Sequence, residues 1–110
     1  MKKLAKFLSI STLFLFSSWA SAGFFSATYL MQVLEKDMRG EEFYETGVFS
    51  GYIVGVHDAG FGILFCTPND VSIKQIKHVV FNYMNNNPDK WGSSASDIVI
   101  ESLEKAWPCN

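Results

Sequence analysis

The sequence predicts an all-α fold, a compact bundle of about four helices stapled by one disulfide. Apolar residues recur at steps of three and four in several segments, as they do on the buried face of a helix. Serine, glycine and proline residues that begin or end helices separate these segments. The chain has 110 residues, of which 48% are hydrophobic and 18% are charged. This length suits one domain, and the apolar content is too high for a disordered chain.

Residues 1–22 have the pattern of a cleavable signal peptide. Three lysines precede an apolar run over residues 7–16, and Ala20 and Ala22 form the small-residue pattern that signal peptidase reads. An uncleaved membrane anchor is the alternative, but the run is nearer ten residues than the roughly 20 that span a membrane. Gly23, and not the Cys of a lipoprotein, follows the expected cleavage site. We therefore expect an exported protein whose residues 23–110 form a single soluble helical domain.

The charge balance of residues 23–110 bears on their partners. Six basic and 11 acidic residues give this part of the chain a net charge of −5. Nucleic-acid binding depends on clusters of Lys and Arg that displace counterions from phosphates, and the sequence has no such cluster. We therefore expect no nucleic-acid partner, and a basic protein partner would suit the chain better.

The first two helices are predicted from their caps and their apolar spacing. Ser26 or Thr28 can cap a helix that reaches about Met38, after which Gly40 ends it. A second helix is expected over about residues 42–64. Its acidic first turn suits the positive end of the helix dipole.

Small residues recur every four positions in the second predicted helix. On a helix they would lie above one another and form a groove without side chains, although each Gly costs about 1 kcal/mol against Ala. We expect another helix of the same domain to pack into this groove. A contact between two copies of the chain is the alternative, and a strand over residues 48–56 is a third possibility, which the glycines disfavour. The residues of this groove are Gly47, Gly51, Gly55 and Ala59.

The third helix has the clearest beginning in the chain. Ser72 and Gln75 form a capping box, and Val71 and Ile76 form a hydrophobic staple around it. The helix is expected to end before Pro88. Its expected apolar face consists of Ile73, Ile76, Val80, Tyr83 and Met84.

A short exposed connection over residues 89–92 leads to the fourth helix. This helix is expected to begin after Ser93 or Ser94, with Asp97 near its start, and to end before Pro108. Its predicted buried stripe consists of Ala95, Ile98, Val99, Leu103 and either Ala106 or Trp107.

Cys66 and Cys109 are the only cysteines, and an even number of cysteines in an exported chain predicts a disulfide. The bond would close a loop of about 43 residues, for which the chain-entropy model gives roughly 4 kcal/mol of stabilisation. One cysteine follows the second predicted helix and the other follows the fourth. The disulfide would therefore hold the ends of these two helices together.

Few residues could support catalysis or bind a metal. His57 and Asp58 are adjacent on a predicted helix, so their side chains point about 100° apart and are not expected to pair. Asp58 is expected to be a buried acid that is hydrogen-bonded to a helix end. A zinc site formed by His57, Asp58 and His78 would lack the usual ligand spacing, and the sequence has no glycine-rich phosphate loop. We therefore expect a binding protein that is not an enzyme and has no metal and no cofactor.

Several motifs in residues 43–109 are specific only in combination. They are FSGYIVGVHDA at residues 49–59, FCTP at residues 65–68 and WPC at residues 107–109, with Val71, Ser72, Gln75, Ile76, Val79, Val80, Tyr83, Met84, Asn87, Pro88, Leu103 and Ala106 between them. Together they resemble the Rap/Tai family of type VI secretion immunity proteins.

The resemblance implies a small all-helical periplasmic protein, often a homodimer. It also implies that the protein binds a peptidoglycan amidase delivered by a neighbouring cell, blocks its active-site cleft and has no catalysis of its own. Many members also link the first helix to the start of the second by a disulfide. This sequence has no cysteine in either place and has Phe49 where one would be expected, so the position of the first helix stays open.

The residues that would bind such a toxin are expected in two places. An acidic cluster around the start of the second helix could meet a basic toxin, and the connection after the third helix presents a large aromatic anchor, Trp91. Trp91 could instead fold back onto the core. The candidate residues are Glu41, Glu42 and Glu45 in the first place, and Asn86, Asp89 and Trp91 in the second.

Two other functions stay open. A small periplasmic chaperone that opens in acid would have a similar size, cysteine content and compartment, and the ten phenylalanines would supply apolar surface. A periplasmic enzyme would depend on His57 or His78.

Overall fold

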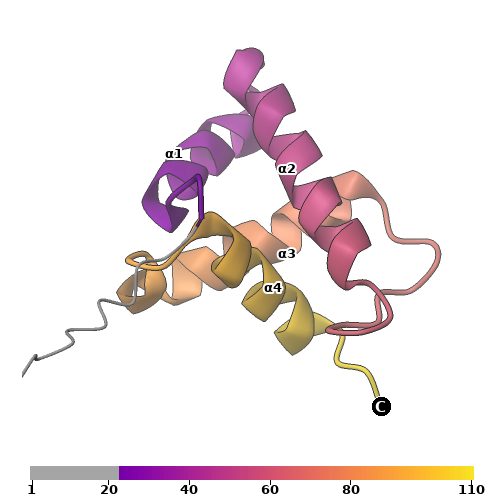
Figure 1. The fold of residues 1–110 in the computed structure, drawn as a ribbon. Coiled ribbons are helices and arrows are strands. Elements are labelled where there is room, and N and C mark those ends of the chain that lie inside the picture. The colour runs from indigo at the N-terminus through magenta and orange to yellow at the C-terminus, as the bar shows by residue number, and fades with distance from the viewer. Residues whose placement is uncertain (1–22) are drawn as a thin grey trace, which may run out of the picture.

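A computed structural model describes residues 23–110 as four helices packed around one core (Figure 1). In chain order these are α1 (Ala27–Met38), α2 (Tyr44–Gly60), α3 (Ile73–Asn86) and α4 (Ala95–Ala106), with a short 3-10 helix, η2 (Pro88–Lys90), before α4. The described residues contain no strand apart from two isolated bridges. The predicted all-α fold is therefore confirmed. The predicted signal peptide, residues 1–22, lies outside the described residues.

Three helices begin at or next to the predicted residue, because a serine caps each of them. The hydroxyl oxygens of Ser26, Ser72 and Ser94 accept hydrogen bonds from the backbone N–H three residues ahead, at 3.1 to 3.2 Å. The Gln75 side chain accepts a bond from the backbone N–H of Ser72 at 2.7 Å, which completes the predicted capping box. Each such cap contributes about 1 kcal/mol to stability.

The second helix is shorter than predicted, since α2 ends at Gly60 and not near Leu64. Phe61 leaves the helix with extended backbone angles. Gly62 has a φ of 80°, a backbone angle that residues with a side chain rarely adopt. Packing also requires a glycine at position 60, because a Cβ there would come within 2.7 Å of the Phe65 ring. The two glycines therefore turn the chain so that Phe65 enters the core, where it is fully buried.

Aromatic rings join α1 and the residues before it to α2, at the place where the family that the sequence resembles often has a further disulfide. Phe49 of α2 is buried and packs against Phe25 and Tyr29, with ring centroids 4.8 and 5.1 Å apart. Tyr52 makes an edge contact with Phe25 at 5.4 Å. Such pairs contribute roughly 0.5–1.5 kcal/mol each beyond their buried area. Phe49 thus holds the first helix in position by packing, without a covalent bond.

All four helices contribute to one hydrophobic core, with one departure from the predicted faces. Ile73 was expected in the core but is 51% exposed, because it is the first residue of α3 and precedes the turn that packs. Of the two residues considered for the end of the stripe of α4, Trp107 packs against the core and Ala106 is exposed. None of the four helices is long and apolar enough to cross a membrane. The fully buried core residues of the helices include Leu30, Leu34, Phe49, Ile53, Val80, Met84, Ile98, Val99 and Leu103.

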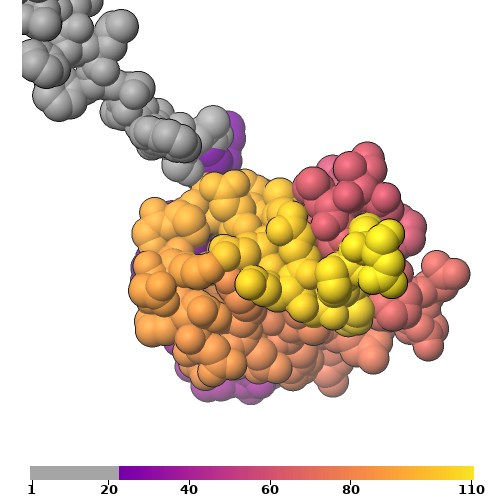
Figure 2. Space-filling view, turned by 90° about the horizontal axis from the view of Figure 1, so that it is seen from below, coloured from indigo at the N-terminus to yellow at the C-terminus, as the bar shows by residue number. Residues whose placement is uncertain are grey.

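The predicted disulfide between Cys66 and Cys109 is present, with a Cα–Cα distance of 5.0 Å. A backbone hydrogen bond from the N–H of Cys66 to the carbonyl of Trp107, at 2.8 Å, joins the same two segments. Seen from below, α4 and the C-terminal segment in yellow lie beside α3 in orange and reach the segment after α2 (Figure 2). The covalent bond therefore holds the end of α2 to the end of α4, as predicted.

Candidate functional site

The predicted partner-binding residues lie in two regions at opposite ends of α1. The first region, the α1–α2 end, comprises the end of α1, the connection to α2, the start of α2 and the start of α3. The second region, the α3–α4 connection, comprises residues 86–93, and its Trp91 carbonyl accepts a hydrogen bond from the Thr28 hydroxyl at the start of α1. Because α1 has 12 residues, the two regions lie about 18 Å apart. The predicted residues are Glu41, Glu42 and Glu45 in the first region, and Asn86, Asp89 and Trp91 in the second.

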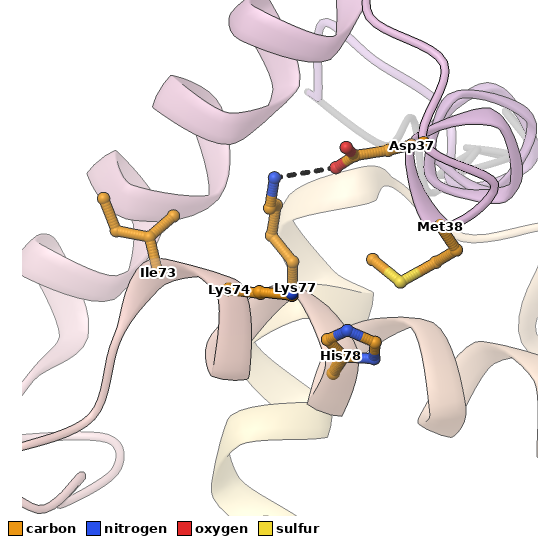
Figure 3. Close-up of a pocket in the computed structure, with 7 residues that line it drawn as sticks. Asp37, Met38, Ile73, Lys74, Lys77 and His78 are labelled. Carbon is orange, nitrogen blue, oxygen red and sulfur yellow. Dashed lines mark ion pairs between the residues drawn. The ribbon is translucent and has the colours of Figure 1, made fainter.

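Three neighbouring cavities open at the α1–α2 end. The largest of the three has a volume of about 550 Å³ and lies between the end of α1 and the first two turns of α3 (Figure 3). A second cavity of about 310 Å³ is lined by residues that include Glu42 and Gly47. A third cavity, of about 230 Å³, is lined in part by Glu45. Two of the three predicted acidic residues therefore line cavities, whereas Glu41 forms an exposed ion pair with Arg39 at 3.2 Å.

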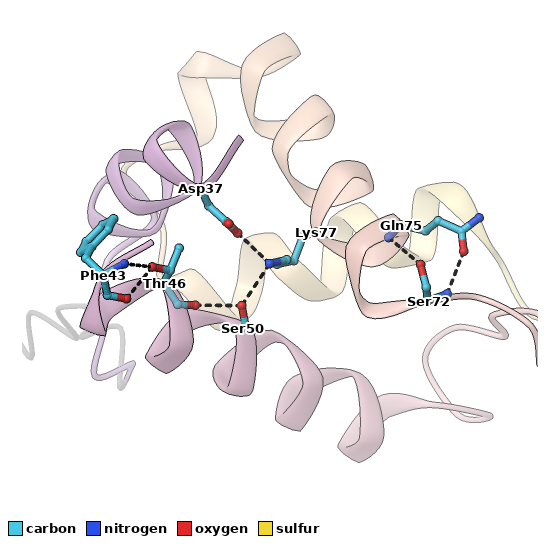
Figure 4. A network of polar contacts seen from close by, with 7 residues as sticks. All are labelled: Asp37, Phe43, Thr46, Ser50, Ser72, Gln75 and Lys77. Atoms are coloured by element: carbon cyan, nitrogen blue, oxygen red, sulfur yellow. Dashed lines mark hydrogen bonds and ion pairs between the residues drawn. The ribbon is translucent and has the colours of Figure 1, made fainter. Parts of the chain in front are cut away.

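One ion pair stands between the first two cavities. Lys77 Nζ lies 2.7 Å from Asp37 Oδ2, and the two side chains are only 16% and 18% exposed. The ammonium also donates to the Ser50 hydroxyl at 3.2 Å, and that hydroxyl donates to the Thr46 carbonyl at 2.8 Å (Figure 4). The network thus connects α1, α2 and α3. A partly buried charge without a partner would carry a large desolvation cost. In this pair, the charges of Asp37 and Lys77 compensate each other.

The pairing of Asp37 with Lys77 was missed by sequence reasoning. The two residues are far apart in the sequence, so no local spacing relates them. One signal could have marked Lys77, which lies four residues after Ile73 and three before Val80 on the apolar side of the helix pattern. A charged residue at such a position needs a buried partner, although the pattern does not say which residue it is.

The α3–α4 connection is held to the helices around it. The side-chain amide of Asn87 donates to the Tyr83 carbonyl at 2.7 Å, and the indole N–H of Trp91 donates to the Met84 carbonyl at 2.8 Å. Trp91 is half-buried and packs against the core. Of the two positions considered for Trp91, the structure therefore shows the one that is folded back onto the core.

Lys90 adds a charged contact to the same connection. Its ammonium forms an ion pair with Glu101 of α4 and donates to the Tyr83 hydroxyl at 2.9 Å. The hydrogen bond with Glu101 raises the pKa of Lys90 well above its ordinary value, and the same bond lowers the pKa of Glu101. Burial raises the pKa of Tyr83. Asn86 and Asp89 stay exposed on this tethered connection.

The small-residue stripe of α2 faces solvent. Gly47, Gly51, Gly55 and Ala59 are all exposed, and nothing lies within 4 Å of a Cβ built at any of the three glycines. The expectation that another helix of the same domain packs into this groove is therefore wrong for residues 23–110. The physical reason is that α2 turns its opposite face, with Phe49, toward the core.

His57 and Asp58 form a contact that local spacing did not predict. His57 Nδ1 lies 3.1 Å from Asp58 Oδ1, and His57 Nε2 lies 2.7 Å from Thr67 Oγ1. The expectation that the two neighbours do not pair is wrong, because the Asp58 carboxylate extends into solvent and can turn back toward the ring. Its side chain is 73% exposed, so the expectation of a buried acid is also wrong.

These contacts have the order of a hydroxyl, an imidazole and a carboxylate, as in hydrolytic triads. In the neutral imidazole, Nδ1–H donates to Asp58, and Nε2 accepts the Thr67 hydroxyl proton. A cavity of about 250 Å³ borders these residues, but Thr67 is only 6% exposed and His57 stacks on Phe61 at 5.5 Å. Because the contacts join His57 of α2 to the buried Thr67, we interpret them as a tie between the end of α2 and the segment after it.

Metal binding finds no support among the described residues. Residues 23–110 contain no group of three or more His, Cys, Asp or Glu side chains that could hold a metal ion. The second histidine, His78, is exposed on α3 and lines the largest cavity of the α1–α2 end. It therefore belongs to a surface region and not to a cluster of ligands.

Residues 23–110 thus form a small helical domain with one disulfide, a tethered connection and several surface cavities. The sequence matches the family model of the Rap1a immunity proteins over residues 26–109, and the chain belongs to this family. Membership suggests a type VI immunity protein that binds a cognate toxin, and such proteins are generally not enzymes. The resemblance seen in the sequence is confirmed at this level. No curated protein matches the chain.

Proposed function

We propose that this chain is a periplasmic immunity protein of the Rap/Tai type, which binds a type VI secreted peptidoglycan amidase and blocks its active-site cleft. The observation that carries the proposal is the match to the Rap1a immunity proteins over residues 26–109. The signal-peptide pattern of residues 1–22 supports export to the compartment that contains peptidoglycan. The disulfide supports the same compartment, because such bonds persist where conditions are oxidising.

The structure supports binding through preformed surfaces. Side-chain hydrogen bonds hold the α3–α4 connection, so exposed Asn86 and Asp89 would lose little conformational entropy when a toxin binds. At the α1–α2 end, Glu42 and Glu45 line open cavities. The net charge of −5 over residues 23–110 would also speed the encounter with a basic toxin.

Inhibition at equal molarity tests this function. Residues 23–110 are purified with the disulfide intact and mixed with the peptidoglycan amidase secreted by the same type VI system. We expect a stable complex in gel filtration and loss of peptidoglycan cleavage. An unrelated amidase acting on the same peptidoglycan is the control and should stay active. Full activity of the cognate amidase in a large excess of the chain would contradict the proposal.

The same material distinguishes the two other functions. An acid-activated chaperone would bind an apolar dye and unrelated unfolded proteins as the pH falls from about 7 to about 2. The immunity protein needs only its cognate toxin at neutral pH. An enzyme would turn over a substrate alone and would lose that activity on His57→Ala or His78→Ala.

We also propose that the stripe of α2 is the contact between two copies in a homodimer. Gly47, Gly51, Gly55 and Ala59 are exposed, and Tyr44 at the start of the same helix is 81% exposed. Each glycine costs about 1 kcal/mol against Ala in a helix. Close approach of a second helix would offset that cost, since residues without large side chains allow two backbones to pack tightly.

Gly51→Leu tests the homodimer without threatening the fold. Leu has a higher helix propensity than Gly, so the monomer should remain folded, while the added side chain should block the contact. We expect light scattering to report a dimer for the wild type and a monomer for Gly51→Leu. Gln32→Leu, at an exposed position of α1, is the matched control and should remain dimeric. A wild-type monomer, or a dimer that survives Gly51→Leu, would contradict the proposal.

A further inference from the structure

The largest cavity of the α1–α2 end, hereafter the α3 cavity, has apolar parts in its wall. It has a volume of about 550 Å³, and Met38 and Ile73 lie on opposite sides of it (Figure 3). Ile73 is 51% exposed, so its side chain offers apolar surface beside the cavity. A partner that covered it would gain about 25 cal/mol for each Å² of apolar surface removed from water.

The charges around the α3 cavity differ from those of the rest of the domain. The negative charge of Asp37 is already compensated by Lys77 at 2.7 Å. Lys74 and His78 are exposed one turn apart on α3, and neither forms an ion pair with the described residues. The positive end of the α3 dipole lies at the same place. Lys74 therefore leaves one uncompensated positive charge at this cavity, although residues 23–110 carry a net charge of −5.

The neighbouring cavity, of about 310 Å³, has an acidic side chain in its wall where the α3 cavity has a basic one. Glu42 lines it, and the Asp37–Lys77 pair lies between the two cavities and adds no net charge to either. A basic side chain of a partner would thus be attracted to the side of Glu42, and an acidic one to the side of Lys74. The two cavities therefore differ in the sign of the charged side chain that lacks an ion-pair partner among residues 23–110, Lys74 in one and Glu42 in the other.

We propose that the α3 cavity binds an acidic side chain of the toxin, with an apolar side chain next to it. The carboxylate would lie between Lys74 and His78, and the apolar neighbour would cover Ile73. This inference rests on the proposed function, because it names a contact of the same toxin. It also predicts a basic position beside the acidic one on the toxin, facing Glu42.

Charge reversal at Lys74 tests the inference. Lys74→Glu places a like charge against the toxin carboxylate, and we expect the inhibition constant for the cognate amidase to rise by about tenfold or more. The fold should survive, because a glutamate in the first turn suits the helix dipole. Lys105→Glu makes the same charge change at an exposed position of α4 and should change the constant by less than about threefold. Lys74→Arg should inhibit like the wild type. Unchanged inhibition by Lys74→Glu would overturn the inference and leave the proposed function intact.

A second experiment does not depend on the amidase. Residues 23–110 labelled with ¹⁵N are titrated with two acetylated and amidated tripeptides, Leu-Glu-Leu and Leu-Lys-Leu. We expect amide shifts at Ile73, Lys74 and His78 with the acidic peptide only, and no such shifts in Lys74→Glu. If the wild-type chain inhibits no amidase, the proposed function fails and this titration decides the selectivity of the cavity. Absent shifts, or equal shifts with both peptides, would then overturn the inference.

Discussion

The α3–α4 connection and the α1–α2 end are both expected to meet a partner, but their polar side chains are used differently. In the connection, Asn87, Lys90 and Trp91 bond to other groups of the same chain. At the α1–α2 end, Glu42 and Lys74 line open cavities. The difference shows that a polar or aromatic residue in a loop indicates binding only if the fold leaves its side chain available. Variants of side chains that bond within the chain should therefore change stability, and variants of side chains that line the open cavities without an internal partner should change affinity.

Removal of the disulfide should have the largest effect and should weaken both regions alike. Replacing Cys66 and Cys109 with Ser releases a loop of 43 residues, for which the entropy model gives a loss of roughly 4 kcal/mol. Urea unfolding gives the free energy of unfolding, and amide exchange compares the two regions. Loss of protection in only one region would show that the bond supports that region alone, and the comparison would need revision.

Trp91→Ala should have the next largest effect, through stability. The variant removes a half-buried indole and its hydrogen bond to Met84, so we expect a loss of about 3 kcal/mol in the free energy of unfolding. Inhibition of the amidase per folded molecule should not change. Asp89→Ala, at an exposed position of the same connection, is the control and should alter stability by less than about 0.5 kcal/mol. Weaker inhibition by a fully stable Trp91→Ala would make this residue a binding anchor.

Lys77→Ala should cost about 2 kcal/mol of stability, because it leaves the partly buried Asp37 without its partner. Lys74→Ala, one turn earlier and exposed, should stay within about 0.5 kcal/mol of the wild type. Adding Asp37→Asn to Lys77→Ala should restore part of the loss, since it removes the uncompensated charge. If the double variant is as unstable as the sum of the two single variants, the ion pair is not the cause.

The pH dependence of the Lys90–Glu101 pair should be the smallest effect, since both side chains are more than one-third exposed. The pKa of Glu101 is lowered, so the contribution of the pair is present above about pH 4.5 and is lost as the pH falls through the lowered value. The pKa of Lys90 is raised, so the positive charge of Lys90, and with it the ion pair, is lost only in strong alkali. Urea unfolding at about pH 7 and about pH 3 should show a slightly larger acid loss for the wild type than for Glu101→Gln. Equal acid losses would show that the pair contributes nothing to folding.

Local chemistry explains which parts of the fold were predictable. Serine caps at residues 26, 72 and 94 accept bonds from backbone groups three residues away, so the helix starts could be predicted from neighbouring residues. The cluster of acidic residues near the start of α2 also predicted Glu42 and Glu45 as partner-binding residues, and both line cavities. Trp91 could not be placed in this way, because its position depends on the Met84 carbonyl and on the core beneath it.

The sequence by itself determined that four helices form, where three of them begin and that one disulfide joins two of their ends. These features depend on capping, apolar spacing and cysteine number, all of which act over short stretches of chain or need no geometry. Only the tertiary structure decided that the stripe of α2 faces solvent, that Asp37 pairs with Lys77 and that His57 contacts Thr67. The physical reason is that the packing of whole helices sets the distance between residues remote in sequence, and no local pattern records which face of a helix will meet its neighbour.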